Sequence, residues 1–130
     1  MSSIPASHRD ILEKRAFAHL ATVDESGAPQ VTPVWFDDAD GFIWVNSAKG
    51  RKKDRNIRAN PRVALSIQDP DNPYRYVGIQ GEVVEITEEG AVDHINKLSH
   101  KYMGRDYPYL SGDEVRVIYK IKPTRVWVMG

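Results

Sequence analysis

A chain of 130 residues suits a single domain over residues 1–130, and a domain of this size buries roughly two-thirds of the surface that its unfolded chain exposes. Lys plus Arg and Asp plus Glu number 18 each, which argues against a general nucleic-acid-binding protein, because such proteins are usually basic overall. The chain has no cysteine, which excludes disulfides and thiolate chemistry. It also has no apolar run near the roughly 18 to 20 residues of a membrane span. Both observations favour a cytoplasmic protein.

The first predicted element is a short helix in the sequence HRDILEKRA, residues 8–16. The spacing of Ile11, Leu12 and Arg15 suits one short helix, and Ser7 is placed to cap it. We expect this helix to lie across one end of a sheet.

Three β-rich runs follow, at residues 17–23, 30–36 and 42–46. They are separated by short segments that contain Gly and Asp, a pattern typical of an antiparallel meander. Pro33 cannot donate a ladder hydrogen bond, so the second strand is predicted to be an edge strand or to be bulged at this residue.

A dense basic segment, residues 49–63, contains seven Lys and Arg residues and one acidic residue. Within it, residues 50–60 are predicted to form a helix that the following proline ends. Arg51, Lys52 and Lys53 would crowd its first turn, where the helix macrodipole is already positive and cations are unfavourable. A bound anion such as a phosphate would compensate for this charge, and a solvated basic helix face is the alternative explanation.

The remaining chain is predicted to contribute four strands and one helix. Gly81 lies in the middle of a long strand, where it marks a bulge or a close backbone approach. The strands are predicted at residues 63–67, 74–86, 115–121 and 124–129, and the helix at residues 88–103. The total of about seven strands and three helices lacks the alternation of parallel β-α-β units, so it predicts a mainly β, antiparallel barrel with helical additions.

Other classes of site lack their sequence motifs. His94 and His100 are six residues apart and face different sides of the predicted helix, and no metal-ligand spacing accompanies them, so no metal site is expected. No nucleophile elbow, dinucleotide fingerprint or P-loop is present. Most strand aromatics are expected to pack in the core, whereas Trp35 and Tyr76 are candidate ligand contacts because each lies near a Pro or Gly irregularity.

Three segments, taken in order, resemble the split β-barrel family of pyridoxamine 5′-phosphate oxidases and their deazaflavin-dependent relatives. They are LATVDESGAPQVTPVWF, VNSAKGRKKDRNIRANPRVALSI and DPDNPYRYVGIQGEV, and the ending KIKPTRVWVMG is one that such proteins tend to show. The resemblance implies a split antiparallel β-barrel of the FMN-binding type with about three helices. It also implies a homodimer that binds two flavin-type cofactors in the clefts between its subunits.

The resemblance further implies which residues contact the cofactor. Basic residues at the helix N-terminus would hold its phosphate, and Lys53 matches best among them. The second strand would run along the ring with its backbone, the third would approach the sugar-alcohol chain, and Tyr76 would reach the cofactor from the other subunit. The implied contacts are Thr32, Pro33, Val34, Trp35, Asn46, Ser47, Ala48, Arg51, Lys52, Lys53 and Tyr76.

The forms TPVWF and NPYRYV look more like the deazaflavin branch, which implies coenzyme F420 as the cofactor, with FMN as the alternative. Lys49, Arg55 and Arg58 supply more positive charge than one phosphate needs, which suits the acidic lactyl-oligoglutamate tail of F420. Pyridoxamine phosphate oxidases also carry a substrate-phosphate arginine near their C-terminus, and the presence of Arg125 alone here argues against vitamin B6 oxidation.

The resulting expectation is an F420H2-dependent oxidoreductase that passes a hydride from C5 of the reduced deazaflavin to an unsaturated small molecule. The alternatives are an FMN-binding split-barrel oxidoreductase, a non-catalytic carrier of flavin or F420, and a protein that binds a polyanion such as RNA. For the favoured function, no metal, membrane or nucleic-acid partner is expected.

Overall fold

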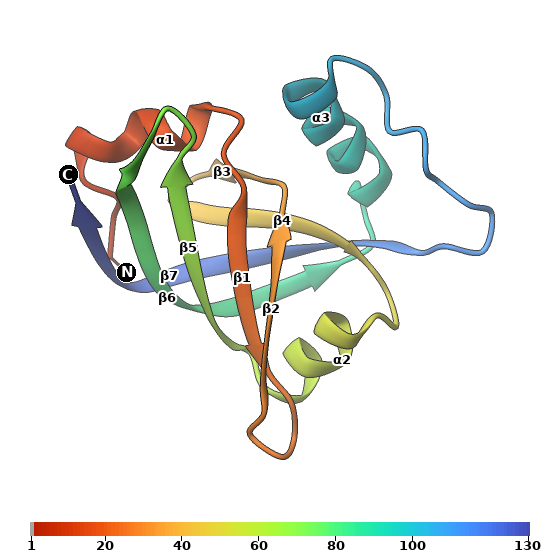
Figure 1. Ribbon diagram of the computed structural model, residues 1–130. Coiled ribbons are helices and arrows are strands. Elements are labelled where there is room, and N and C mark those ends of the chain that lie inside the picture. The colour runs from red at the N-terminus through yellow and green to blue at the C-terminus, as the bar shows by residue number, and fades with distance from the viewer. Residues whose placement is uncertain (1) are drawn as a thin grey trace.

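The computed structural model describes residues 2–130 (Figure 1). One sheet contains seven strands in the order β2-β1-β5-β6-β7-β4-β3, and neighbouring strands are antiparallel. The strands are β1 (Ala18–Val23), β2 (Pro29–Val34), β3 (Phe36–Ala39), β4 (Phe42–Ala48), β5 (Arg62–Asp69), β6 (Asn72–Thr87) and β7 (Arg116–Met129). The helices are the 3-10 turn η1 (Ala6–His8), α1 (Arg9–Glu13), α2 (Lys52–Ala59) and α3 (Ala91–Met103).

The two edge strands of the sheet are β2 and β3, and only Trp35 separates them in the chain. Because consecutive Cα atoms are about 3.8 Å apart, Val34 and Phe36 lie within about 7.6 Å of each other, which brings the two edges together at this corner. The sheet therefore curls into a barrel that closes at Trp35 (Figure 1). This confirms the predicted split antiparallel barrel.

The interior of the curled sheet holds the apolar core. Along β5, Val63, Leu65 and Ile67 are buried and alternate with more exposed residues, as their spacing predicts. At one end of the sheet, α1 lies across the strands and buries Ile11 and Leu12 against them (Figure 1). The predicted position of the first helix is thus confirmed.

Two irregular strand positions behave as predicted. Pro33 lies on β2, an edge strand, where its missing N–H costs no ladder hydrogen bond. The pairing of β6 with β7 shifts register between Gln80 and Gly81, which is a bulge. A Cβ at Gly81 would lie 2.8 Å from Ile121 Cγ2 and 2.9 Å from the carbonyl oxygen of Lys122, so this site requires glycine.

Several predicted boundaries are wrong. The run 30–36 is not one strand, because the chain leaves its pairing with β1 after Val34 and begins to pair with β4 at Phe36. Residues 115–121 and 124–129 are not two strands, since β7 is continuous and Pro123 lies opposite the Gly81 bulge. A bulge accommodates proline inside a paired strand because the ladder is already interrupted there.

The helices also begin differently from the prediction. Ser7 does not cap the first helix: its hydroxyl lies 2.7 Å from Nδ1 of His8, and a 3-10 turn precedes α1. The third helix begins at Ala91 rather than at residue 88, after Gly90 in the left-handed conformation. No helix within residues 2–130 is long and apolar enough to cross a membrane.

Candidate functional site

The first turn of α2 is anchored by Asp54, a buried carboxylate in the middle of the basic segment. Oδ2 of Asp54 accepts the backbone N–H of Gly50 at 2.9 Å and Nε–H of Arg58 at 3.0 Å, while Oδ1 accepts the hydroxyl of Tyr119 at 2.7 Å. Burial alone would raise the pKa of Asp54, but these hydrogen bonds outweigh it and lower the pKa. Asp54 therefore ties the turn before α2 to β7 in the core.

Most cations of the basic segment have a carboxylate partner. Arg51 NH2 lies 2.9 Å from Glu114, and Arg58 pairs with Asp54. Two lysines make longer, exposed contacts, Lys49 with Glu88 at 3.4 Å and Lys52 with Asp24 at 3.7 Å. Of the three residues expected to supply surplus charge, Lys49 and Arg58 are thus paired within the chain. Arg55 donates to the carbonyl of Gly50 and has no carboxylate partner among residues 2–130.

Lys53 has no carboxylate partner and, unlike Arg55 and Arg62, which also lack one among residues 2–130, it is not exposed. It is half-buried and makes no ion pair with any of residues 2–130. Burial lowers the pKa of its ammonium, and the nearby charges of Arg51 and Arg116 lower it further. These three residues, which we call the basic cluster, carry three positive charges against the single carboxylate of Glu114. A partly buried cation among other cations is stabilised by a bound anion, so the cluster fits a phosphate group.

Arg116 enters this cluster from β7 and was not predicted from the sequence. Its side chain is 3% exposed, and its NH1 lies 2.7 Å from Glu114. Its Nε donates to Oδ1 of Asn46 at 2.9 Å. Arg116 stands between valines in the sequence VRVIY, and a charged residue within an apolar strand was the signal that could have found it.

Behind Arg116, a chain of hydrogen bonds continues through Asn46 into α3. Nδ2 of Asn46 donates to the carbonyl of Ala91 at 2.8 Å and lies 3.1 Å from Nδ1 of His94. Nε2 of His94 lies 2.8 Å from the carboxylate of Asp37. The sequence assigned no role to His94, yet this buried histidine links α3 to β3 and β4.

The residues predicted to approach a sugar-alcohol chain, Asn46, Ser47 and Ala48, are all buried on β4. The Asn46 side chain is fully engaged inside the protein. Their side chains therefore point into the protein, and contacts from this strand to a ligand would come from its backbone.

The residues predicted to run along a cofactor ring lie on β2 and at its end. Thr32 and Pro33 belong to the edge strand, and Oγ1 of Thr32 is buried without a hydrogen-bond partner among residues 2–130. Ser47 Oγ, Ser99 Oγ and Trp44 Nε1 are buried without a partner in the same way, so this atom does not by itself mark a ligand position. Val34 is buried in the core.

Trp35 packs in an aromatic cluster rather than standing free. Its ring stacks on Tyr102 with centroids 5.2 Å apart and planes 4° apart, and meets Tyr107 edge-on at 6.0 Å. Burial raises the pKa of Tyr102 to about 12, so its hydroxyl stays protonated and donates to the carbonyl of Ala16. The cluster fixes the corner where the barrel closes.

Tyr76 is not brought to the basic cluster within one chain. It pairs with Met129 at one end of β7, and Arg116 of the cluster begins the same strand thirteen residues earlier. Tyr76 and the cluster therefore lie toward opposite ends of β7 in one chain.

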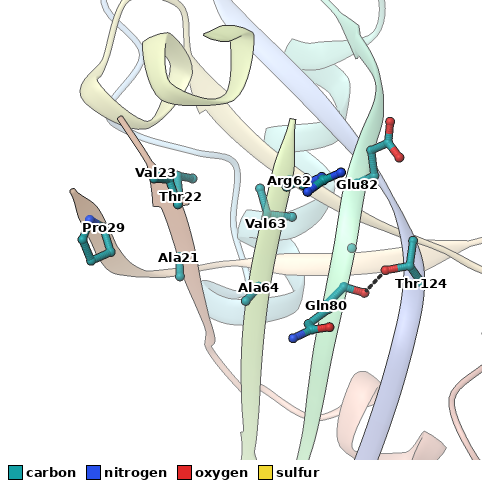
Figure 2. A pocket seen from close by; sticks show the side chains of 11 residues that line it. Ala21, Thr22, Val23, Pro29, Arg62, Val63, Ala64, Gln80, Glu82 and Thr124 are labelled. Carbon is teal, nitrogen blue, oxygen red and sulfur yellow. Dashed lines mark hydrogen bonds between the residues drawn. The ribbon is translucent and has the colours of Figure 1, made fainter. Parts of the chain in front are cut away.

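A cavity of about 610 Å³ lies on the outer side of β1, β5 and β6 (Figure 2). Small residues form its floor, among them Ala21, Ala64 and Gly81. Figure 2 also shows the hydroxyl of Thr124 donating to the carbonyl of Gln80, at 3.0 Å. None of the predicted cofactor contacts lines this cavity.

No group of three or more acidic or histidine side chains within residues 2–130 could hold a metal ion.

Comparison with known proteins identifies the family. The sequence matches the family described as pyridoxamine 5′-phosphate oxidase over residues 4–130. A pyridoxine/pyridoxamine 5′-phosphate oxidase of Bradyrhizobium sp. (strain BTAi1) is 36% identical over 88 residues, which are 66% of this chain and 39% of that protein. The match therefore spans well under half the length of that curated relative.

Two solved structures resemble the whole chain. An F420 reductase has a TM-score of 0.86 and 36% sequence identity, and the match covers 95% of this chain and 98% of that one. A conserved hypothetical protein of Mycobacterium tuberculosis has a TM-score of 0.77 and 25% identity, covering 99% of this chain and 86% of that one. With the family match over nearly every residue and the closed corner at Trp35, the chain belongs to the pyridoxamine 5′-phosphate oxidase family.

Proposed function

We propose that this protein is an F420H2-dependent oxidoreductase that reduces an unsaturated small molecule. The observation that carries the proposal is Lys53, a half-buried cation that lies among Arg51 and Arg116 without a carboxylate of its own within residues 2–130. A phosphate is the group whose charge and oxygen acceptors suit these side chains. The likeness to an F420 reductase over 95% of the chain supports the deazaflavin as the molecule that carries this phosphate.

In this proposal the chain binds and orients the cofactor, and the cofactor carries the redox chemistry. When bound, reduced F420 supplies a hydride from C5 to an electrophilic double bond of the substrate. Arg51 and Lys53 bind the phosphate together with Arg116, and Lys52 in the same turn of α2 adds positive charge nearby. The backbone at the free edge of β2 aligns the ring of the cofactor. Pro33 lies on this edge and has no backbone N–H of its own to point at the ring.

We also propose that the functional unit is a homodimer. Large apolar side chains are exposed on strands of the barrel, including Val31 at 63%, Trp127 at 42% and Met129 at 53%. Such side chains favour burial against another surface. A second copy placed there would bring its Tyr76 toward the cofactor, which one chain alone does not do.

FMN is the second candidate, because two observations favour it. Of the three cations that suggested room for an acidic tail, Lys49 and Arg58 pair with Glu88 and Asp54 instead, which leaves only Arg55 without a carboxylate among residues 2–130. The basic cluster by itself suits the phosphate of a mononucleotide. An FMN-binding oxidoreductase, or a carrier of either cofactor, would use the same cluster.

The test is a titration of the purified protein with oxidised F420 and, separately, with FMN, followed by cofactor fluorescence. Micromolar or tighter binding of F420 alone supports the proposal, and preference for FMN supports the second candidate. A reduced cofactor that is reoxidised by a panel of unsaturated compounds distinguishes an enzyme from a carrier. If neither cofactor binds, and binding of RNA instead weakens steeply with salt, the basic segment serves a polyanion.

A further inference from the structure

Glu114 is the carboxylate that joins the two arginines of the basic cluster. A single oxygen, Oε1, lies 2.9 Å from NH2 of Arg51 and 2.7 Å from NH1 of Arg116. The Glu114 side chain is only 13% exposed, and that of Arg116 is 3% exposed. Both are short, charge-assisted contacts; the one to Arg116 is largely buried, whereas Arg51 is half exposed. The contact between Lys49 and Glu88 is longer and exposed on both sides.

A buried guanidinium needs a counter-charge, and within residues 2–130 only Glu114 supplies one to Arg116. A phosphate at the cluster would offer the same kind of acceptor to the same donors. The phosphate and the carboxylate would also repel each other, because both are anions close to one point. Each guanidinium has further N–H donors to offer, so the two groups compete for Arg51 and Arg116 through this charge repulsion.

We propose that Glu114 is an internal competitor for the phosphate: it occupies Arg51 and Arg116 in the free protein and gives up contacts with them when the phosphate binds. The inference rests on the proposed function, since it concerns the same site. It adds that the free protein holds its own anion in that site, so the affinity for cofactor is lower than the cations alone would give.

Glu114 belongs to the segment between α3 and β7, so the loss of its contacts with the arginines would also affect other residues of that segment. The N–H of Glu114 donates to the carbonyl of Ser111 at 3.2 Å, and the next residue, Val115, accepts from the N–H of Lys49 at 2.8 Å. In the same segment, the ring of Tyr107 lies 5.3 Å from the guanidinium of Arg116. Occupancy of the cluster is thereby coupled to the segment that packs against Trp35.

The test compares E114Q with E88Q. Each removes one carboxylate next to the basic segment, but Glu88 makes only an exposed contact 3.4 Å from Lys49. Binding of F420, of FMN and of inorganic phosphate is measured for each variant. We expect E114Q to tighten binding of whichever cofactor the wild type binds by about fivefold or more, and E88Q to change it by less than about twofold.

A stability measurement accompanies the binding test, because the E114Q substitution leaves Arg116 without its counter-charge. We expect a lower Tm for E114Q without anions and a larger increase in Tm on adding inorganic phosphate than for the wild type. If E114Q does not fold, E114D keeps the charge but retracts it by one methylene, and it is expected to bind cofactor about twofold more tightly than the wild type.

The outcomes separate this inference from the proposed function. If K53A weakens cofactor binding while E114Q, or E114D in its place, leaves it unchanged or weaker, the cluster binds phosphate and the competitor role is wrong. If the wild type binds neither cofactor, the proposed function is wrong. In that case the competitor role is tested by the increase in Tm that inorganic phosphate causes. An increase for E114Q equal to that of the wild type would show that the competitor role is wrong.

Discussion

Replacement of Asp54 by Asn tests how the turn before α2 is held. Asp54 is 1% exposed and accepts three hydrogen bonds, two of them at Oδ2. Asn keeps one acceptor oxygen but presents an NH2 group to the donors of Gly50 and Arg58. Because hydrogen bonds to a charged group contribute about 1.5–3 kcal/mol each, and part of the site can rearrange, we expect a loss of about 2–4 kcal/mol in the free energy of unfolding.

For a domain of this size, 1 kcal/mol corresponds to a shift of about 3–5 °C in Tm, so D54N should unfold about 6–20 °C below the wild type. Thermal unfolding followed by circular dichroism at neutral pH measures this. The control is D113N, which removes an exposed carboxylate and should leave Tm nearly unchanged. A Tm for D54N within about 2 °C of the wild type would show that the three contacts do not stabilise the fold as we infer.

The pH dependence of the stability difference between the wild type and D54N gives an independent check. The pKa of Asp54 is lowered in the folded protein, so its contribution is present above the unfolded pKa near 3.8 and is lost as the pH falls through the folded pKa. The difference in stability between wild type and D54N should therefore narrow on acidification. A gap that stays constant down to the acid limit would mean that the carboxylate charge is not what stabilises the turn.

Three further changes have defined outcomes. K53A should weaken cofactor binding about 10- to 100-fold, because it loses a charge-assisted contact of about 1.5–3 kcal/mol. The affinity of the wild type should fall at high pH, because the pKa of Lys53 is already lowered. Fluorescence titration over a range of pH measures both effects, and equal affinities of K53A and the wild type for the cofactor would show that Lys53 does not contact it. G81A should destabilise the fold by about 1–3 kcal/mol, since its Cβ would lie 2.8 Å from a buried side chain, whereas G112A meets nothing within 4 Å and serves as the control in denaturant unfolding. R75M should move acid unfolding to higher pH. The backbone N–H of Asp71 and the ammonium of Lys14 lower the pKa of Asp69 most, and Arg75 adds to them to bring it to about 2, so stability kept between roughly pH 4 and 2 would be lost earlier. An unchanged acid midpoint would contradict this.

The sequence predicted the barrel because its signals were local. Alternating burial along β5, a proline on an edge strand and a glycine at a bulge each depend on a few neighbouring residues. The break at Trp35 depends on pairing partners far along the chain: Val34 pairs with Ala18, and Phe36 pairs with Val45. No local sequence pattern indicates that change of pairing partner, so the predicted strand 30–36 is too long.

The candidate site was predicted in part for a similar reason. The excess of cations at the start of α2 is visible in the sequence, and the structure leaves Lys53 without a carboxylate within residues 2–130. The carboxylate of Glu114, just before β7, and the guanidinium of Arg116, at its start, complete the environment and lie more than sixty residues further along the chain. The roles of individual residues at a cofactor stay predictions, because they depend on a bound ligand and a second subunit.

The place of β7 in the sheet has a consequence for folding during synthesis. This strand is the last one in the described chain, yet it lies between β6 and β4 and pairs with both. Until its residues leave the ribosome, the set β2-β1-β5-β6 and the hairpin β3-β4 have no strand to join them. Both then expose unpaired edges that can associate with other chains. The two parts of the sheet can therefore join only after β7 has been made, although all the other strands precede it in the chain.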